Sequence, residues 1–174
     1  MEGKKPFLPR MTKNKLSEFD QAQSVGWVLE RAIQIEKRID NIIFNFIDPN
    51  NKEAFISHIL NSSVMSYGGK LKVLHRIIGY EKKRKKLYND LQRIGSIRNS
   101  FAHNEFSSVM NIHFAPNKGT RQWHDQVISV MKSNGEIDSK NPLEFLKEYL
   151  VLLKKVEPEL QEIWEEQMSK INNQ

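Results

Sequence analysis

Arg98, Asn99 and His103 are the residues of this sequence that are best suited to chemistry. They lie in the stretch IRNSFAHN at residues 97–104, where four residues separate the arginine from the histidine. A guanidinium group binds phosphate through paired hydrogen bonds, and an imidazole exchanges protons near neutral pH. With an adjacent amide, these groups could bind an anion and transfer a proton beside it.

These residues end a predicted helix that begins in the basic run EKKRKK at residues 81–86. On a helical wheel that starts at Leu87, one face is apolar and Arg98 lies inside it, about 20° from Leu87. Because a guanidinium cannot lose its charge, a buried Arg98 requires a carboxylate, a partner subunit or an anion. Glu36 and Asp40 on the first predicted helix are both candidates for the carboxylate. The apolar face consists of Leu87, Leu91, Ile94, Ile97, Phe101 and Ala102.

Asn99 and His103 are four residues apart on one flank of the same helix, so the amide could orient the imidazole. Arg98 and His103 are separated by about 140° around the helix axis. They can contact one ligand only if the helix ends at His103, if Arg98 reaches around it, or if a second copy supplies part of the site. Alternatively, Arg98 forms a buried salt bridge and His103 interacts with the helix C-terminus.

The elements that must position these residues are mostly helical. A long helix is expected from Leu16 to Ile47 and should end at Asp48, which precedes a proline. A shorter helix is expected over residues 52–64, followed by another around residues 66–80 with a turn at Gly68–Gly69. The apolar residues of the long helix recur at alternating intervals of three and four: Val25, Val28, Ala32, Ile35, Ile39, Ile42 and Phe46.

The region from about 105 to 140 contains β-prone runs, and Asn134–Gly135 is a strong signal for a hairpin turn. The last helix should begin after Asn141 as N-cap, and Pro158 should kink or divide it. The expected fold class is therefore mainly all-α. It is an antiparallel bundle of about five helices with a small β-hairpin insertion, in a single domain over residues 16–174 after a flexible basic arm at residues 1–15.

Composition excludes several classes of protein. The 174 residues contain no cysteine, which excludes disulfides and thiolate metal sites and fits a cytoplasmic location. No segment has the length and hydropathy of a signal peptide or a membrane span. The histidines lack the spacing of a zinc site, so we expect no metal and no cofactor.

A net charge of +6 favours a polyanionic partner. The candidate nucleic-acid-binding residues lie before the motif helix or in its first turns. Cations at the N-terminus of a helix oppose the helix dipole, a cost that a bound anion would offset. The alternative is a solvated basic face. The candidates are Lys70, Lys72, Lys82, Lys83, Arg84, Lys85 and Lys86.

The pattern of Arg98, Asn99 and His103, preceded by SYGGKLKVLHRIIG, resembles the HEPN superfamily over roughly residues 20–106. Within it, the chain looks most like the branch that contains the mannitol operon repressor family. The resemblance implies a homodimer in which the motifs of two subunits face one cleft, and a metal-independent endoribonuclease with a toxin, defence or stress role. His103 would then be the general acid or base, Arg98 would stabilise charge on the phosphate, and Asn99 would hold the phosphate or the imidazole.

The resemblance also supports a second reading. Members of the repressor-like branch are regarded as regulatory, so the same residues could build a subunit or partner interface in a non-catalytic transcriptional regulator or interaction module. Expected partners are therefore RNA, a second copy, and an antitoxin or regulatory protein. Direct DNA binding is disfavoured because the sequence has no convincing helix-turn-helix pattern.

Overall fold

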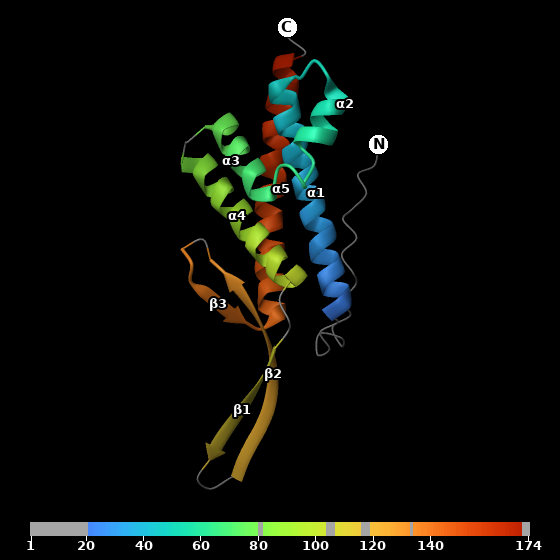
Figure 1. Cartoon of the computed structure of the whole chain (residues 1–174). Coiled ribbons are helices and arrows are strands. Elements are labelled where there is room, and N and C mark those ends of the chain that lie inside the picture. Colours follow the sequence, from blue (N-terminus) through green and yellow to red (C-terminus); the bar gives the residue numbers. More distant parts are fainter. Residues whose placement is uncertain (1–20, 80–81, 104–106, 116–118, 133, 172–174) are drawn as a thin grey trace, which may run out of the picture.

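The computed structural model describes residues 21–79, 82–103, 107–115, 119–132 and 134–171, so the predicted basic arm at residues 1–15 lies outside the described residues. The fold is mainly helical and has a β insertion before the last helix, as the sequence predicts (Figure 1). The helices are α1 (Gln21–Ile47), α2 (Lys52–Ala54), α3 (Tyr67–Ile78), α4 (Lys82–His103) and α5 (Pro142–Ile171), and a π-helical turn (Phe55–Ile59) continues α2.

One hydrophobic core joins the four long helices. α1 packs against α3, α4 and α5, and α4 also contacts α3, α5 and strand β2 (Gly119–Met131). The predicted core face of α4 is confirmed, except that Ala102 is only partly buried. The residues of α4 in the core are Leu87, Leu91, Ile94, Ile97 and Phe101.

The apolar seam of α1 is confirmed from Val28 to Ile42, but the expectation for Phe46 is wrong. Phe46 is 59% exposed, whereas Ile43 is fully buried. Phe46 lies on the same face as Val28, because the interval between them is a whole number of helical turns. It falls in the last turn of α1, where the described partner helices do not cover that face. Periodicity therefore identified the face but not the length over which it is covered.

The end of α1 follows the prediction and the start of α3 does not. α1 ends at Ile47, and Asp48 has a positive φ of 42°. Gly68 and Gly69 form no turn, because both lie in the first helical turn of α3. The N-cap is Ser66, whose Oγ accepts a hydrogen bond from the Gly69 amide at 3.3 Å. This cap stabilises the first turn of α3, although two consecutive glycines disfavour a helix there.

The β insertion has three antiparallel strands in the order β1–β2–β3: β1 (Ser107–Ala115), β2, and β3 (Ile137–Lys140). The outer part of β2 pairs with β1, from Ala115 opposite Gly119 to Ser107 opposite Val127. The inner part pairs with β3, starting at Ile128 opposite Lys140. β1 and the outer part of β2 project away from the helices (Figure 1).

The predicted turn at Asn134–Gly135 is confirmed, since Gly135 has a φ of 85° and its amide donates to the carbonyl of Lys132 at 3.0 Å. The insertion is larger than the single hairpin that the sequence predicted, because β1 and β2 form a second one. Ile128 and Val130 from the inner part of β2 are buried in the core. The insertion is therefore attached to the bundle through its inner half.

α5 has a capped N-terminus and is continuous through its proline. The side chain of Asn141 accepts a hydrogen bond from the Leu143 amide at 2.9 Å, which confirms the predicted N-cap. The helix continues through Pro158 without being divided. Buried residues on both sides of the proline, Val156 and Leu160, hold that turn against the core.

Arg93 connects α4 with the insertion and α5. Its Nε donates to Glu148 at 2.6 Å and its Nη2 donates to Asp138 at 2.9 Å. Lys140 lies 3.2 Å from the same Asp138 carboxylate. Burial raises the pKa of Asp138, but hydrogen bonds from Lys140 and Arg93 outweigh it and leave that pKa below its usual value. These charges therefore stabilise the contact between three elements.

Candidate functional site

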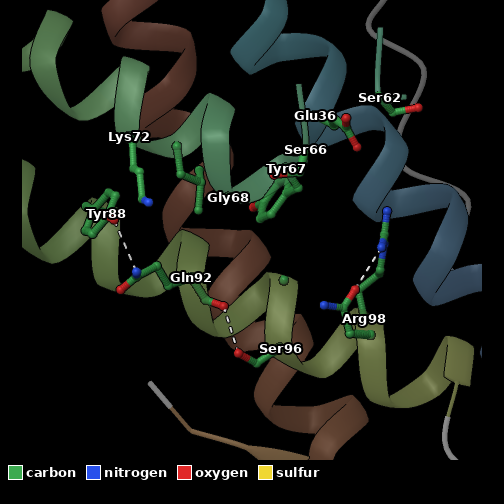
Figure 2. A pocket seen from close by; sticks show the side chains of 13 residues that line it. Glu36, Ser62, Ser66, Tyr67, Gly68, Lys72, Tyr88, Gln92, Ser96 and Arg98 are labelled. Atoms are coloured by element: carbon green, nitrogen blue, oxygen red, sulfur yellow. Dashed lines mark hydrogen bonds between the residues drawn. The ribbon is translucent and has the colours of Figure 1, made fainter. Parts of the chain in front are cut away.

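Arg98 lines a groove of about 530 Å³ that is formed by α1, α3, α4 and the segment before α3 (Figure 2). Most of the residues that line it have polar side chains. Its lining includes two cations, Arg98 and Lys72, and one carboxylate, Glu36. The remaining polar side chains are the hydroxyls of Ser62, Ser66, Tyr67, Tyr88 and Ser96 and the amides of Gln92 and Asn99. A space of this volume falls in the size range of small-ligand sites in proteins.

The guanidinium of Arg98 is partly buried at the edge of this groove. Its Nη1 donates a hydrogen bond to Oδ1 of Asn99 at 2.8 Å. Within the described part of the chain, Arg98 forms no ion pair with a carboxylate. A neutral amide orients the guanidinium but does not neutralise it, so Arg98 brings a positive charge to the groove that no described carboxylate pairs with directly.

The two carboxylates that the sequence offered to Arg98 are instead bound by Lys70. Its Nζ lies 2.8 Å from Oε1 of Glu36 and 2.8 Å from Oδ2 of Asp40. These carboxylates therefore pair with a buried cation, as the sequence predicted, but that cation is Lys70 on α3 and not Arg98. Arg98 lies within the angular range of the core face, but its long side chain carries the guanidinium out to the groove.

His103 is the motif residue that differs in its position relative to the groove. It is exposed in the last turn of α4 and does not line the groove, whereas Asn99 does. α4 is described as far as His103. The residues that decide whether the helix ends there, which was one of the three conditions for both side chains to act on one ligand, lie outside the described residues. A single chain thus brings Arg98 and Asn99 together at the groove and leaves His103 beside it.

The candidate basic residues have different environments. Lys72 is exposed and lines the groove, and Lys85 and Lys86 are exposed on α4. Lys70 is only 2% exposed, so we correct its assignment as a nucleic-acid contact. Arg84 is largely buried and pairs with Glu166 at 3.3 Å. Lys82 and Lys83 lie in the first turn of α4, but their side chains fall outside the described residues.

Sequence reasoning missed Tyr67 and Gly95, which line the groove where α3 meets α4. The hydroxyl of Tyr67 donates to the carbonyl of Leu91 at 3.0 Å, and its ring lies against Gly95. Burial raises the pKa of the Tyr67 phenol, which keeps the hydroxyl protonated as a donor. The available signal was Gly95 itself, because a glycine in a helix interior costs about 1 kcal/mol relative to alanine and needs a packing reason.

The described residues contain no cluster of histidine and carboxylate side chains that could hold a metal ion. No described helix is long and apolar enough to cross a membrane. No family model, no curated protein and no solved structure matches this chain.

Proposed function

We propose that the chain is a HEPN-like RNA-binding protein whose groove receives the RNA backbone, with Arg98 as the phosphate contact. The observation that carries this proposal is the charge of Arg98, which no described carboxylate pairs with directly, in a groove lined mostly by polar side chains. Lys72 adds a second cation to the same lining. The hydroxyl and amide groups of the groove supply donors and acceptors for ribose and base without specifying one sequence.

Cleavage requires a proton-transfer group at the phosphate, and His103 is the candidate. Because His103 lies outside the groove of its own chain, the proposed active site is composite: Arg98 and Asn99 come from one subunit and His103 from a second copy. His103 takes the proton of the ribose 2′-hydroxyl, whose oxygen attacks the adjacent phosphorus while the bond to the 5′-oxygen breaks. The leaving 5′-oxygen takes a proton from water, and His103 returns its proton to the solvent. Arg98 stabilises the charge on the phosphoryl oxygens. The products are a 2′,3′-cyclic phosphate and a 5′-hydroxyl, and no metal is needed; such activity fits a toxin, defence or stress role.

The test uses a labelled single-stranded RNA in EDTA, with wild-type protein, Arg98→Ala and His103→Ala. We expect cleavage by the wild type only, and no cleavage of the DNA of the same sequence, which lacks the 2′-hydroxyl. Mixing the two inactive variants should restore about a quarter of the wild-type rate, because half of the dimers then contain one intact composite site. Absence of wild-type cleavage refutes the nuclease proposal, and inactive mixtures refute the composite site.

A second candidate function is favoured by the position of His103 itself. An exposed histidine beside the groove can form part of a protein interface in a non-catalytic regulator or interaction module. This candidate predicts that wild-type protein binds RNA or a partner without cutting RNA, and that His103→Ala changes the oligomer mass in light scattering. Unchanged mass together with RNA cleavage would exclude it.

A further inference from the structure

Lys70, Glu36 and Asp40 form a cluster of three charges directly behind the groove. The Lys70 side chain is 2% exposed, that of Glu36 is 13% exposed and that of Asp40 is 24% exposed. Both Nζ–O distances are 2.8 Å, so one ammonium group binds two carboxylates at hydrogen-bonding distance. The cluster carries one net negative charge.

Glu36 belongs both to this cluster and to the groove. It lines the groove together with Arg98, and Figure 2 shows both side chains at the same end of it. Tyr67 lies within electrostatic range of both, since the negative charge of Glu36 raises the pKa of its phenol and the positive charge of Arg98 lowers it. A carboxylate this near a guanidinium is a competitor for it, because an arginine bound to carboxylate must break that ion pair before it can bind phosphate.

We propose that Lys70 is a positioning residue that reserves Arg98 for an anionic ligand by engaging Glu36 and Asp40 itself. This inference rests on the proposed role of Arg98 as the phosphate contact of the groove. With Lys70 present, the carboxylate oxygens have a cation at 2.8 Å, and Arg98 is oriented by the neutral amide of Asn99 instead. Without Lys70, an ionised Glu36 loses its cation. Arg98 can replace it, because Arg98 lies at the same end of the groove as Glu36 whereas Lys72 lies at the other end (Figure 2).

The test compares two sets of substitutions in the full chain. Lys70→Met with Asp40→Asn leaves Glu36 as the single charge of the cluster and allows it to pair with Arg98. Adding Glu36→Gln removes every charge of the cluster and preserves its shape. The probe is a fluorescein-labelled oligouridine, measured by anisotropy in EDTA with a His103→Ala background to prevent cleavage. Circular dichroism checks that each variant is folded.

We expect the double variant to bind oligouridine about tenfold more weakly than the parent, as Arg98→Ala does, because a charge-assisted contact to phosphate is lost in both. The triple variant should bind like the parent. This recovery separates positioning from structural support, since a support role would leave the triple variant as weak as the double. If the double variant does not fold, Lys70→Gln with Asp40→Asn replaces it, because the glutamine amide still donates to Glu36 without its charge.

Two results overturn the inference. The first is a folded double variant, with either methionine or glutamine at position 70, that binds oligouridine as tightly as the parent. The second is a triple variant that binds as weakly as the double. Failure of the underlying function looks different, because Arg98→Ala would then bind like the parent whatever residue stands at position 70.

Discussion

The ring of Tyr67 packs so closely against Gly95 that a Cβ atom at residue 95 would lie 2.7 Å from Cε1 of the tyrosine. This contact joins α3 to α4 at the wall of the groove. It also aligns the Tyr67 hydroxyl with the carbonyl of Leu91, to which it donates at 3.0 Å. The glycine thus sets the distance between the two helices that carry Lys72 and Arg98.

Gly95→Ala is therefore expected to displace Tyr67 and to lower the free energy of unfolding by about 1–3 kcal/mol, as overpacking does in well-packed interiors. The same change should weaken RNA binding, because the groove wall moves. Urea denaturation and anisotropy measure the two effects. The matched control is Gly26→Ala on α1, where a Cβ atom would meet nothing within 4 Å. If both alanines are equally tolerated, the Tyr67 contact does not constrain the helices.

Lys72→Ala is expected to reduce the dependence of RNA affinity on salt. Each phosphate contact releases a counterion, so the slope of log K against log salt should become less steep by about 0.7 for a single strand. The control is Lys154→Ala, which removes an exposed cation from α5, a helix that does not line the groove. Identical slopes for Lys72→Ala and the wild type would remove Lys72 from the binding surface.

Arg93→Met is expected to lower the free energy of unfolding by about 1–3 kcal/mol, which is less than for a fully buried pair because Arg93 remains 19% exposed. The loss arises because Glu148 and Asp138 lose a cation that holds α4, β3 and α5 together. Lys132→Ala serves as the control, since its ion pair with Glu136 lies at the exposed tip of the hairpin. That change should leave stability nearly unchanged, because solvent screens an exposed ion pair. Equal costs in urea denaturation would show that the Arg93 network adds nothing specific.

Alkaline pH is expected to destabilise the fold through Tyr67 and Tyr149. Burial raises the pKa of both phenols above the usual value of 10.0. The unfolded chain therefore loses these protons first, so the stabilisation is fully present below about pH 10 and is lost as pH rises towards the folded pKa values. Each group contributes a slope of about 1.4 kcal/mol per pH unit in that window.

Tyr149→Phe tests this pH dependence, because it removes one titrating group and the hydrogen bond to the carbonyl of Val28 at 3.1 Å. The variant should be less stable at neutral pH and should lose stability less steeply above pH 10. Urea denaturation over a series of alkaline buffers measures both values. A slope equal to that of the wild type would show that Tyr149 does not contribute.

Much of the fold could be predicted because local rules decide it. Periodicity predicted the buried face of α4, a proline located the end of α1, and Asn134–Gly135 located a hairpin turn. Local rules failed where distant parts of the chain meet. Phe46 follows the period of α1, but its burial depends on where the other helices end. Gly68 and Gly69 suggest a turn, but the cap at Ser66 and the packing of α3 favour a helix.

The candidate site was harder to predict for the same reason. The wheel placed Arg98 within the core face, and Glu36 and Asp40 on α1 were the candidate carboxylates for it. The choice of cation depended on how α3 docks, and it brought Lys70 rather than Arg98 to these carboxylates. The sequence predicts Lys70 as a nucleic-acid contact on the surface, because a lysine that follows two glycines and precedes a leucine gives no local signal of burial. Which cation binds these carboxylates depends on how the helices pack, and the local sequence does not determine that packing.

The two ladders that share β2 have a consequence for how the protein can vary. The chain leaves the bundle at Ser107 and returns at Val127, which is its direct partner in the β1–β2 ladder. Among the residues of the insertion whose burial is described, Ile128 and Val130, which follow Val127, lie in the core. The projecting hairpin is therefore modular: paired residues can be added to it or removed without moving α4 or α5. Its reach can change independently of the groove.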